Sequence, residues 1–209
     1  MSGRVLVACE FSGVVRRAFA ARGYDAWSCD LLPAEDGSNK HLQCDVRDIL
    51  DHGWELLIVA HPPCTRLCLS GVRWLHNPPQ GRTLEEMWRE LDEAADLFSD
   101  LWHAPIPKRC IENPVMHRHA RARIRNYQPP AQYIQPWQFG HGETKKTGLW
   151  LHNLPPLKPT CIVEGRRQRV HRLPPSPDRW KERSRTYPGI AEAMAAQWGP
   201  LLQMTEVAA

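Results

Sequence analysis

The sequence predicts an α/β fold in which a mostly parallel sheet carries helices on both faces. The first observation is the opening unit, residues 4–30, where a strand, a glycine-containing turn, a helix and a second strand end at an acidic residue. The second is the run Leu56-Leu57-Ile58-Val59-Ala60, which is rich in apolar and β-branched residues and stops just before Pro62-Pro63. Such a run is typical of a parallel strand that is buried on both faces.

The chain has the size and composition of one globular domain with a small appendage. Its 209 residues include 42% hydrophobic and 24% charged side chains, and the formal net charge is a mild +4. No apolar run approaches the roughly 18 residues of a membrane-spanning helix, and no signal peptide is recognised. The seven cysteines lack the spacing of a disulfide scaffold. We therefore expect a protein of the reducing cytoplasm without a membrane partner.

The opening unit has the order of elements found in nucleotide-binding sheets. A strand over 4–9 is followed by Phe11-Ser12-Gly13, a helix over 14–22, and a strand over 24–29 that leads to Asp30. In this position a glycine lets the backbone approach a ligand, and the acid can accept hydrogen bonds from ribose hydroxyls. Because the turn has one glycine instead of three, a plain tight turn with a solvated aspartate is an equal alternative.

Periodicity and turn residues predict the remaining elements. A capping box of Thr83 and Glu86 opens an amphipathic helix that runs to Leu101. A basic run, residues 117–125, contains four arginines and no acid. On a helix, Arg118, Arg121 and Arg125 would share one face, either solvated or in contact with phosphate. The further strands are predicted at 41–46, 54–60, 108–111, 132–135 and 148–152, and a last helix is predicted after Pro188-Gly189.

Cys64 and Glu112 are the candidate reactive side chains. Each follows a predicted strand, and in open α/β sheets the carboxyl ends of the strands form the ligand-binding edge. For an arbitrary cysteine a buried structural role is the commoner outcome, but Cys64 lies beyond its strand, on a loop stiffened by Pro62-Pro63. A thiolate is a strong nucleophile, and a glutamate with a raised pKa is a general acid. Such a pair can add sulfur to an electron-poor ring carbon while the acid protonates a ring nitrogen, which activates a pyrimidine.

Residues 153–185 differ in composition from the rest of the chain. The stretch is rich in proline and shows little apolar periodicity, and residues 165–185 carry eight lysines or arginines against Asp178 and Glu182. We interpret residues 153–185 as an extended, irregular basic insertion. The sequence therefore predicts one main domain, formed by residues 1–152 and 186–209, that is interrupted by this basic insertion.

In the order of its motifs the chain resembles the catalytic domain of DNA cytosine-5 methyltransferases, of the compact kind found in phages and prophages. Phe11-Ser12-Gly13 is similar to the first cofactor-binding motif, and Asp30 and Asp45 are similar to the acids that hold the ribose and adenine of S-adenosylmethionine. The most specific matches are Pro62-Pro63-Cys64, which resembles the nucleophile motif, and Glu112-Asn113, which resembles the family's Glu-Asn pair. The resemblance implies a Rossmann-like methyltransferase fold with a mostly parallel sheet of seven strands.

The resemblance also implies a reaction and a set of site residues. Cys64 would attack C6 of a flipped cytosine in DNA, Glu112 would protonate N3, and Asn113 would hold the loop, so that C5 takes the methyl group of S-adenosylmethionine. No metal is implied. The cofactor site would comprise Phe11, Ser12, Gly13, Asp30, Asp45 and Pro62, and the substrate or DNA contacts would comprise Pro63, Arg66, Ser70, Lys145, Lys146, Arg166, Arg167 and Arg169.

The chain departs from the family pattern in several places. His61 replaces the glycine that is common before the two prolines, and the family's Gln-x-Arg-x-Arg pattern is absent near Lys145 and Lys146. Only the basic insertion stands in place of a target-recognition domain, and phosphate contacts carry no direct sequence information. We therefore expect relaxed sequence specificity or an accessory protein, and a monomer or weak dimer in a bacterial or phage-infected cell.

Three other functions stay open beside this one. A zinc cytidine deaminase needs His-x-Glu before Pro-Cys-x-x-Cys, whereas His141-Gly142-Glu143 follows Pro63-Cys64 and Cys68 is one residue too far along. A non-catalytic DNA-binding module of the same fold predicts DNA binding that survives loss of Cys64. An enzyme that acts on free nucleotides or RNA, or that uses a modified sulfonium donor, predicts turnover on a mononucleotide without strong salt dependence.

Overall fold

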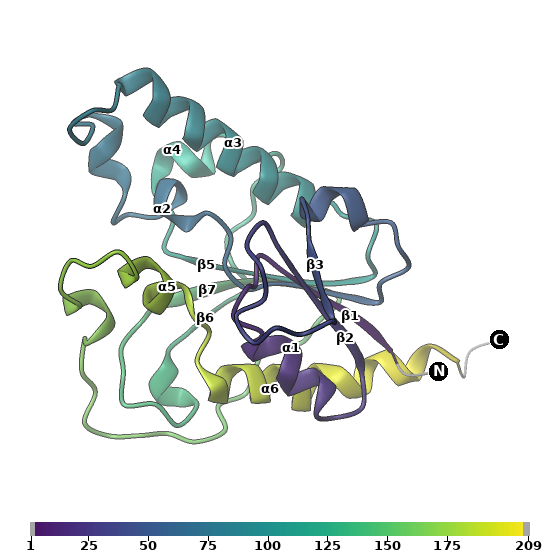
Figure 1. The fold of residues 1–209 in the computed structure, drawn as a ribbon. Helices are drawn as coiled ribbons and strands as arrows, with labels where there is room; N and C mark the ends of the chain where they lie inside the picture. Colours follow the sequence, from purple (N-terminus) through teal and green to yellow (C-terminus); the bar gives the residue numbers. More distant parts are fainter. Residues whose placement is uncertain (1–2, 207–209) are drawn as a thin grey trace.

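The computed structural model, which describes residues 3–206, contains one seven-stranded sheet with helices on both faces (Figure 1). The strand order is β3-β2-β1-β4-β5-β7-β6, and β7 runs antiparallel to both of its neighbours while the other pairs are parallel. The predicted α/β fold class, a mostly parallel seven-stranded sheet with helices on both faces, is therefore confirmed. The strands are β1 (Arg4–Ala8), β2 (Asp25–Asp30), β3 (His41–Gln43), β4 (Leu56–Val59), β5 (Lys108–Pro114), β6 (Gln132–Ile134) and β7 (Thr147–His152).

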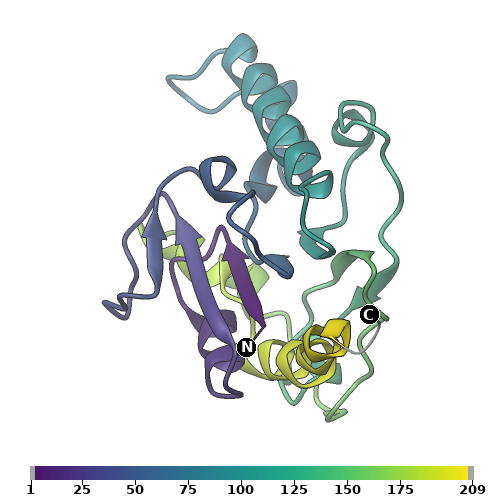
Figure 2. The ribbon, with the colours of Figure 1, turned by 90° about the vertical axis from the view of Figure 1, so that its right-hand side faces the viewer.

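Alternating side chains of the central strands divide the core into two layers, as the period of two in a strand requires. In β1, Val5 belongs to the layer covered by α1 (Val14–Ala20) and α6 (Pro188–Trp198). The next residue, Leu6, belongs to the layer covered by α3 (Leu84–Trp102). Figure 2 shows α3 on one side of the sheet and α6 on the other. Both faces of the central strands are therefore buried, which explains their continuous apolar runs.

The long helix α3 begins at the predicted capping box. The Thr83 hydroxyl accepts a hydrogen bond from Glu86 N at 3.1 Å, and the Glu86 carboxylate accepts one from Thr83 N at 2.9 Å. The predicted apolar stripe, with Met87, Leu91 and Phe98 among its members, is buried against the sheet. Among residues 3–206, no helix is long and apolar enough to pass through a bilayer.

The remaining helices are short and join the larger elements. They are α2 (Cys64–Leu67), α4 (Arg118–Arg121), α5 (Arg179–Ser184) and the 3₁₀ turns η1 (Val46–Ile49), η2 (Val72–Leu75), η3 (Pro136–Gln138), η4 (Val170–Arg172) and η5 (Gly199–Glu206).

Strand β5 continues further than the sequence indicated. It was expected to stop at Ile111 and to leave Glu112 and Asn113 on a loop, but Glu112 pairs with Leu149 and Asn113 with Gly148 of the antiparallel neighbour β7. Pairing with β7 keeps two polar residues in regular strand geometry. The Glu112 side chain is consequently fixed by the sheet instead of by a loop.

The basic run at 117–125 forms only the single helical turn α4, so the predicted shared face of its arginines is wrong for Arg125. Arg125 lies beyond the helix and pairs with Asp100 of α3 at 2.5 Å, and Arg123 pairs with Asp92 of the same helix at 2.5 Å. These arginines are held on α3 by acidic side chains, which favours a surface role over phosphate contact.

The basic insertion has little regular structure. It contains only η4 and the six-residue helix α5, and most of its side chains are exposed. The apolar residues Leu154 and Leu157 at its start are buried in the layer that also contains α6. The helix α6 then begins at Pro188 itself, because the first turn of a helix does not need the N–H that proline lacks.

Candidate active site

A cavity of about 870 Å³ opens at the carboxyl ends of the parallel strands. The short helices α2 and α5 lie at the same end of the sheet (Figure 1), and residues of both line the cavity. This is the edge at which open α/β sheets bind ligands. The structure brings ten of the predicted site residues to its wall: Phe11, Asp30, Asp45, Pro62, Pro63, Cys64, Ser70, Glu112, Lys145 and Lys146.

Cys64 is the first residue of α2, directly after the two prolines. Three hydrogen bonds tie this helix to the chain that leaves β5: Leu69 N to Val115 O at 3.0 Å, His117 N to Leu67 O at 3.1 Å, and His117 Nε2 to Arg66 O at 2.6 Å. Because the same chain segment follows Glu112, these bonds fix where Cys64 lies relative to that carboxyl group.

The Cys64 thiol has a second thiol as its neighbour. Cys68 lies one helical turn on, and its N–H donates to Cys64 O at 2.9 Å. Hydrogen bonding with Cys68, together with burial, raises the pKa of Cys64, and Lys145 acts in the opposite direction. The Cys68 sulfur in turn contacts Ser70 Oγ at 3.0 Å. Burial and the neighbouring Cys68 therefore favour the neutral thiol form of Cys64.

Glu112 is the buried acid of the cavity, with 6% of its surface exposed. Lys145 Nζ lies 3.7 Å from Oε1, and the Thr186 hydroxyl donates to Oε2 at 3.4 Å. Burial raises the pKa of Glu112, and Lys145 and Thr186 partly offset that effect. A carboxyl group in this position can hold a proton and donate it to a bound base.

Two residues close in sequence to Cys64 and Glu112 have different surroundings. Asn113 is not in the cavity wall; its side-chain amide donates to Pro114 O at 2.8 Å and so holds the end of β5. His61 does line the cavity, and burial lowers its pKa to about 3, with Lys145 acting in the same direction. Its Nε2 has no hydrogen-bond partner among the described residues. The sequence marked His61 only as a departure from a family pattern.

The turn after β1 is held by a residue that sequence reasoning missed. Glu10 is fully buried and accepts hydrogen bonds from Val15 N at 2.6 Å and Arg16 N at 3.1 Å, the free N–H groups of the first turn of α1. Gly13 adopts a left-handed conformation with φ of 67°. The buried Ser12 hydroxyl has no partner within the described part of the chain.

The two aspartates that the sequence predicted to hold a cofactor differ in their surroundings. Asp30 ends β2, and burial raises its pKa. Asp45 was expected to end the third strand, but β3 stops at Gln43, and Asp45 caps η1 by accepting from Arg47 N at 3.0 Å. Hydrogen bonds from the Arg47 side chain lower the pKa of Asp45. Asp45 is thus a carboxylate, and Asp30 is more easily protonated.

Several residues expected to contact DNA lie outside the cavity wall. Arg66 Nε is paired with Glu90 of α3 at 2.6 Å, and Arg169 Nε lies 3.3 Å from the buried Glu143 carboxylate. The Arg166 guanidinium lies 3.6 Å from the centroid of the Trp137 ring, and Arg167 N donates to Gly142 O at 3.1 Å. Of the two lysines considered, Lys145 contacts Glu112, whereas Lys146 Nζ lies over the Tyr133 ring at 4.4 Å.

Part of the cavity wall comes from the basic insertion, which no local sequence signal indicated. Its lining residues include Val170, His171, Arg179, Trp180, Arg183 and Ser184. The Trp180 ring packs on Phe11 with centroids 5.6 Å apart. These contacts join segments far apart in the chain, so periodicity and motifs cannot reveal them.

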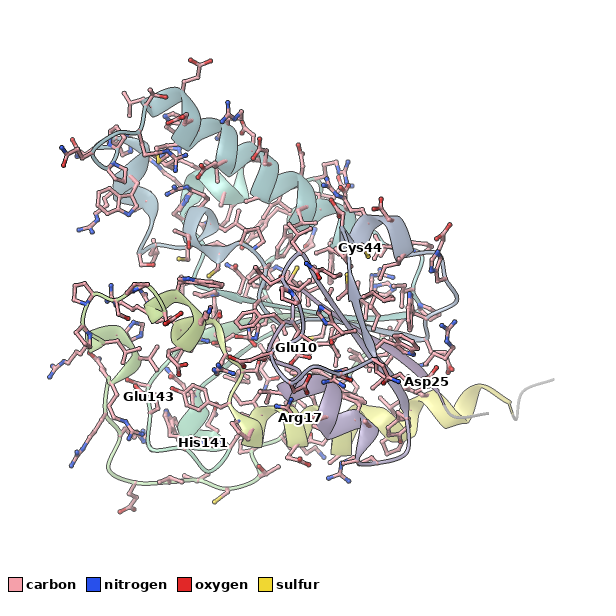
Figure 3. The ribbon with its side chains drawn as sticks, in the orientation of Figure 1. Glu10, Arg17, Asp25, Cys44, His141 and Glu143 are labelled. Atoms are coloured by element: carbon pink, nitrogen blue, oxygen red, sulfur yellow. The ribbon has the colours of Figure 1, made fainter. Side chains whose placement is uncertain are left out.

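The residues of a deaminase-like zinc site do not converge. His141 and Glu143 lie near each other beside the start of α6 (Figure 3), where His141 Nε2 accepts a hydrogen bond from Gly189 N at 2.9 Å. Neither residue lines the cavity that contains Cys64. Within residues 3–206, no group of three or more His, Cys, Asp or Glu side chains has the arrangement of a metal site.

Comparison with known proteins gives a structural match at low identity. The chain is similar to a solved structure described as a candidate DNA modification methyltransferase encoded within a prophage of E. coli, with a TM-score of 0.48 and 12% sequence identity. The alignment covers 78% of this chain and 52% of the other, so the chain spans about half the length of that protein. No protein-family model and no curated protein matches the sequence.

Proposed function

We propose that this protein is a DNA cytosine-5 methyltransferase that uses S-adenosylmethionine. The observation that carries the proposal is that a cysteine thiol, Cys64, and a buried acid, Glu112, line the same cavity, with Lys145 beside the acid. The cavity lies at the ligand-binding edge of a methyltransferase-type sheet. This combination of nucleophile and proton donor is what addition to a pyrimidine ring requires.

Phe11, Asp30 and Asp45 line one part of the cavity, which we call the cofactor half. This half fits a nucleoside without a phosphate group. In dinucleotide-binding sheets, the N-terminus of the first helix binds the pyrophosphate. Here the carboxyl group of Glu10 already occupies the N–H groups of Val15 and Arg16. S-adenosylmethionine, a nucleoside that contains no phosphate, supplies an electrophilic methyl group when it is bound.

Six residues would hold this cofactor, and their chemistry is complementary to its parts. A carboxylate such as Asp45 can accept hydrogen bonds from ribose hydroxyls or an exocyclic amine. An aromatic ring such as Phe11 offers an apolar surface to a purine. The set proposed is Phe11, Ser12, Gly13, Asp30, Asp45 and Pro62, of which Ser12 and Gly13 shape the turn without lining the cavity.

The chain's own residues can carry the steps on cytosine. Cys64, after loss of its proton, forms a bond between its sulfur and C6, and Glu112 donates a proton to N3 as electron density moves through the ring. C5 then carries the electron pair that would accept the methyl group, whose bond to the sulfonium sulfur would break and leave a neutral thioether. A base then removes the C5 proton, which re-forms the C5–C6 double bond as the C6–S bond breaks and Cys64 leaves as a thiolate. N3 returns its proton to Glu112. Lys145 keeps the Glu112 carboxylate in place between these steps.

The acceptor must be an extrahelical base, because C5 and C6 cannot be reached within the stacked duplex. Arg166 and Arg167 are exposed in the basic insertion and can contact backbone phosphates, which gives affinity without sequence readout. We therefore infer relaxed sequence specificity or an accessory protein, and a monomer or weak dimer. The seven cysteines are all free, which is compatible with a cytoplasmic location.

The test uses cytosine-rich duplex DNA and S-adenosylmethionine labelled in its methyl group. After digestion to nucleosides, mass analysis should find labelled 5-methylcytosine with the wild type and none with Cys64→Ser. Cys161→Ser, which changes an exposed cysteine outside the cavity, is the matched control and should retain the activity. DNA binding without transfer by any variant would favour the non-catalytic module, and transfer to free nucleotide or RNA alone would replace the acceptor.

A further inference from the structure

Exposed apolar side chains gather at the mouth of the cavity. Within the described part of the chain, seven large hydrophobic residues are strongly exposed, and four of them line this one cavity. The four are Leu31 (72% exposed), Leu32 (37%), Leu69 (56%) and Trp180 (50%). A local concentration of exposed apolar surface around a cavity is typical of a binding site for a partly apolar ligand.

Trp180 is the largest of these side chains and belongs to the cofactor half. It lies on α5 of the basic insertion, and its ring packs on Phe11 with an interplanar angle of 54°. Phe11 lies in the turn between β1 and α1, and both residues line the cavity. Half of the Trp180 surface is still free, so the contact with Phe11 leaves the indole able to pack against a further planar ring.

Contacts of the residues that follow α5 hold Trp180 at this place. Arg185 forms a two-pronged ion pair with Glu35, with N–O distances of 2.5 and 2.6 Å. Glu35 N in turn donates to Phe11 O at 2.9 Å, so that the ion pair and the ring contact attach the insertion to the same turn. The next residue, Thr186, donates to Glu112 at 3.4 Å. The basic insertion is thereby linked to the cofactor half of the cavity, and the residue that follows it is linked to Glu112.

We propose that Trp180 is a cofactor-binding residue: the adenine ring of S-adenosylmethionine packs against its indole, and the Arg185–Glu35 pair positions the indole. This inference rests on the proposed function and assigns part of the cofactor site to the basic insertion. A purine is planar and largely apolar on its faces, which is the ligand surface that an aromatic wall with free area accommodates. The two leucines after β2 extend the same apolar wall.

The test is calorimetric titration of S-adenosylhomocysteine, the demethylated form of the cofactor, into the full chain without DNA. Trp180→Ala should bind about tenfold more weakly than the wild type, and Trp180→Phe should restore most of the affinity. Glu35→Gln should weaken binding roughly two- to fivefold, because an exposed ion pair contributes modestly. Ile162→Ala removes another exposed apolar side chain of the basic insertion, outside the cavity, and should change nothing.

The outcomes separate this inference from the proposed function. If the wild type binds the ligand and Trp180→Ala binds it equally well, Trp180 is only a packing partner of Phe11 and the inference is overturned. If the wild type binds no S-adenosyl compound, the proposed function fails and the inference fails with it. Thermal unfolding of every variant confirms that the chains compared are folded, and Trp180→Phe keeps the comparison valid should the alanine variant unfold.

Discussion

Lys145 Nζ lies 3.7 Å from Oε1 of Glu112, with only 12% and 8% of the two side chains exposed. Burial raises the pKa of Glu112, and the Lys145 ammonium group lowers it again by stabilising the carboxylate. The protonation of the proposed acid therefore depends on a charge from the chain segment just before β7. Lys145 is a positioning residue for that acid, whatever further contact it makes with a substrate.

Lys145→Met should raise the pKa of Glu112 above its wild-type value, because the stabilising charge is lost while burial remains. The protonated acid would then persist to higher pH, and any activity that needs it would decline at a higher pH than in the wild type. A ¹³C NMR titration of glutamate-labelled protein measures the carboxyl pKa directly. Lys146→Met is the control, since Lys146 lies over Tyr133. An equal shift in both variants would contradict a specific role for Lys145.

Glu10 should make the stability of the protein depend on pH. Burial raises the pKa of Glu10 from 4.5 to about 7, so the fold prefers the protonated form. Its contribution is present below about pH 4.5 and is lost as the pH rises towards 7, because the unfolded chain then releases a proton that the folded chain retains. Over this range the free energy of unfolding should fall by up to about 3 kcal/mol more in the wild type than in Glu10→Gln.

Denaturant unfolding at pH 5, 6 and 7 checks this prediction. Glu93→Gln, at an exposed position on α3, controls for the loss of one carboxyl group and should follow the wild type. Parallel pH profiles for the wild type and Glu10→Gln would show that Glu10 is ionised throughout the range. Glu10 would then cap the first turn of α1 as a charged carboxylate.

Local sequence patterns predicted the elements whose structure depends on local preferences. The capping box before α3 and the apolar run of β4 were both found where the sequence indicated. The end of β5 was misjudged because Glu112 and Asn113 are polar, and only pairing with β7 keeps them in the strand. Because β7 lies more than thirty residues after β5 in the sequence, the local pattern around Glu112 does not indicate this pairing.

For the candidate site, too, the sequence predicted the residues at strand ends and missed those that depend on distant contacts. The positions of Cys64 and Glu112 near the ligand-binding edge follow from strand ends, which the sequence shows. The preference for Lys145 over Lys146 beside Glu112 depends on which side chain reaches the carboxyl group, and the sequence left both possible. Trp180 was missed because its contact with Phe11 forms only when the basic insertion folds back over the sheet.

Gly71 should be essential for the loop that carries Cys64. A Cβ atom at this position would lie 1.7 Å from the carbonyl oxygen of Thr65, which is backbone and cannot move without shifting α2. Gly71→Ala should therefore lower the free energy of unfolding by about 2 kcal/mol and change the rate at which Cys64 is alkylated. At Gly142 a Cβ would meet no atom closer than 3.6 Å, so Gly142→Ala is the control. Equal stability of the two variants would contradict the steric argument.

Arg66 and Arg166 should differ in their effect on DNA binding, although both were expected to contact DNA. Arg66 is held by Glu90 with 13% of its side chain exposed, whereas Arg166 is exposed and its guanidinium lies over the Trp137 ring. Each phosphate contact changes the slope of log K against log salt by about 0.9. Arg166→Ala should reduce the slope by this amount, and Arg66→Ala should leave it unchanged while lowering stability by about 1 kcal/mol through loss of the contact with α3.

Fluorescence anisotropy with labelled duplex at several salt concentrations gives both slopes. A reduced slope for Arg66→Ala would mean that DNA displaces Glu90 from Arg66, and the ion pair would then be a feature of the free protein only.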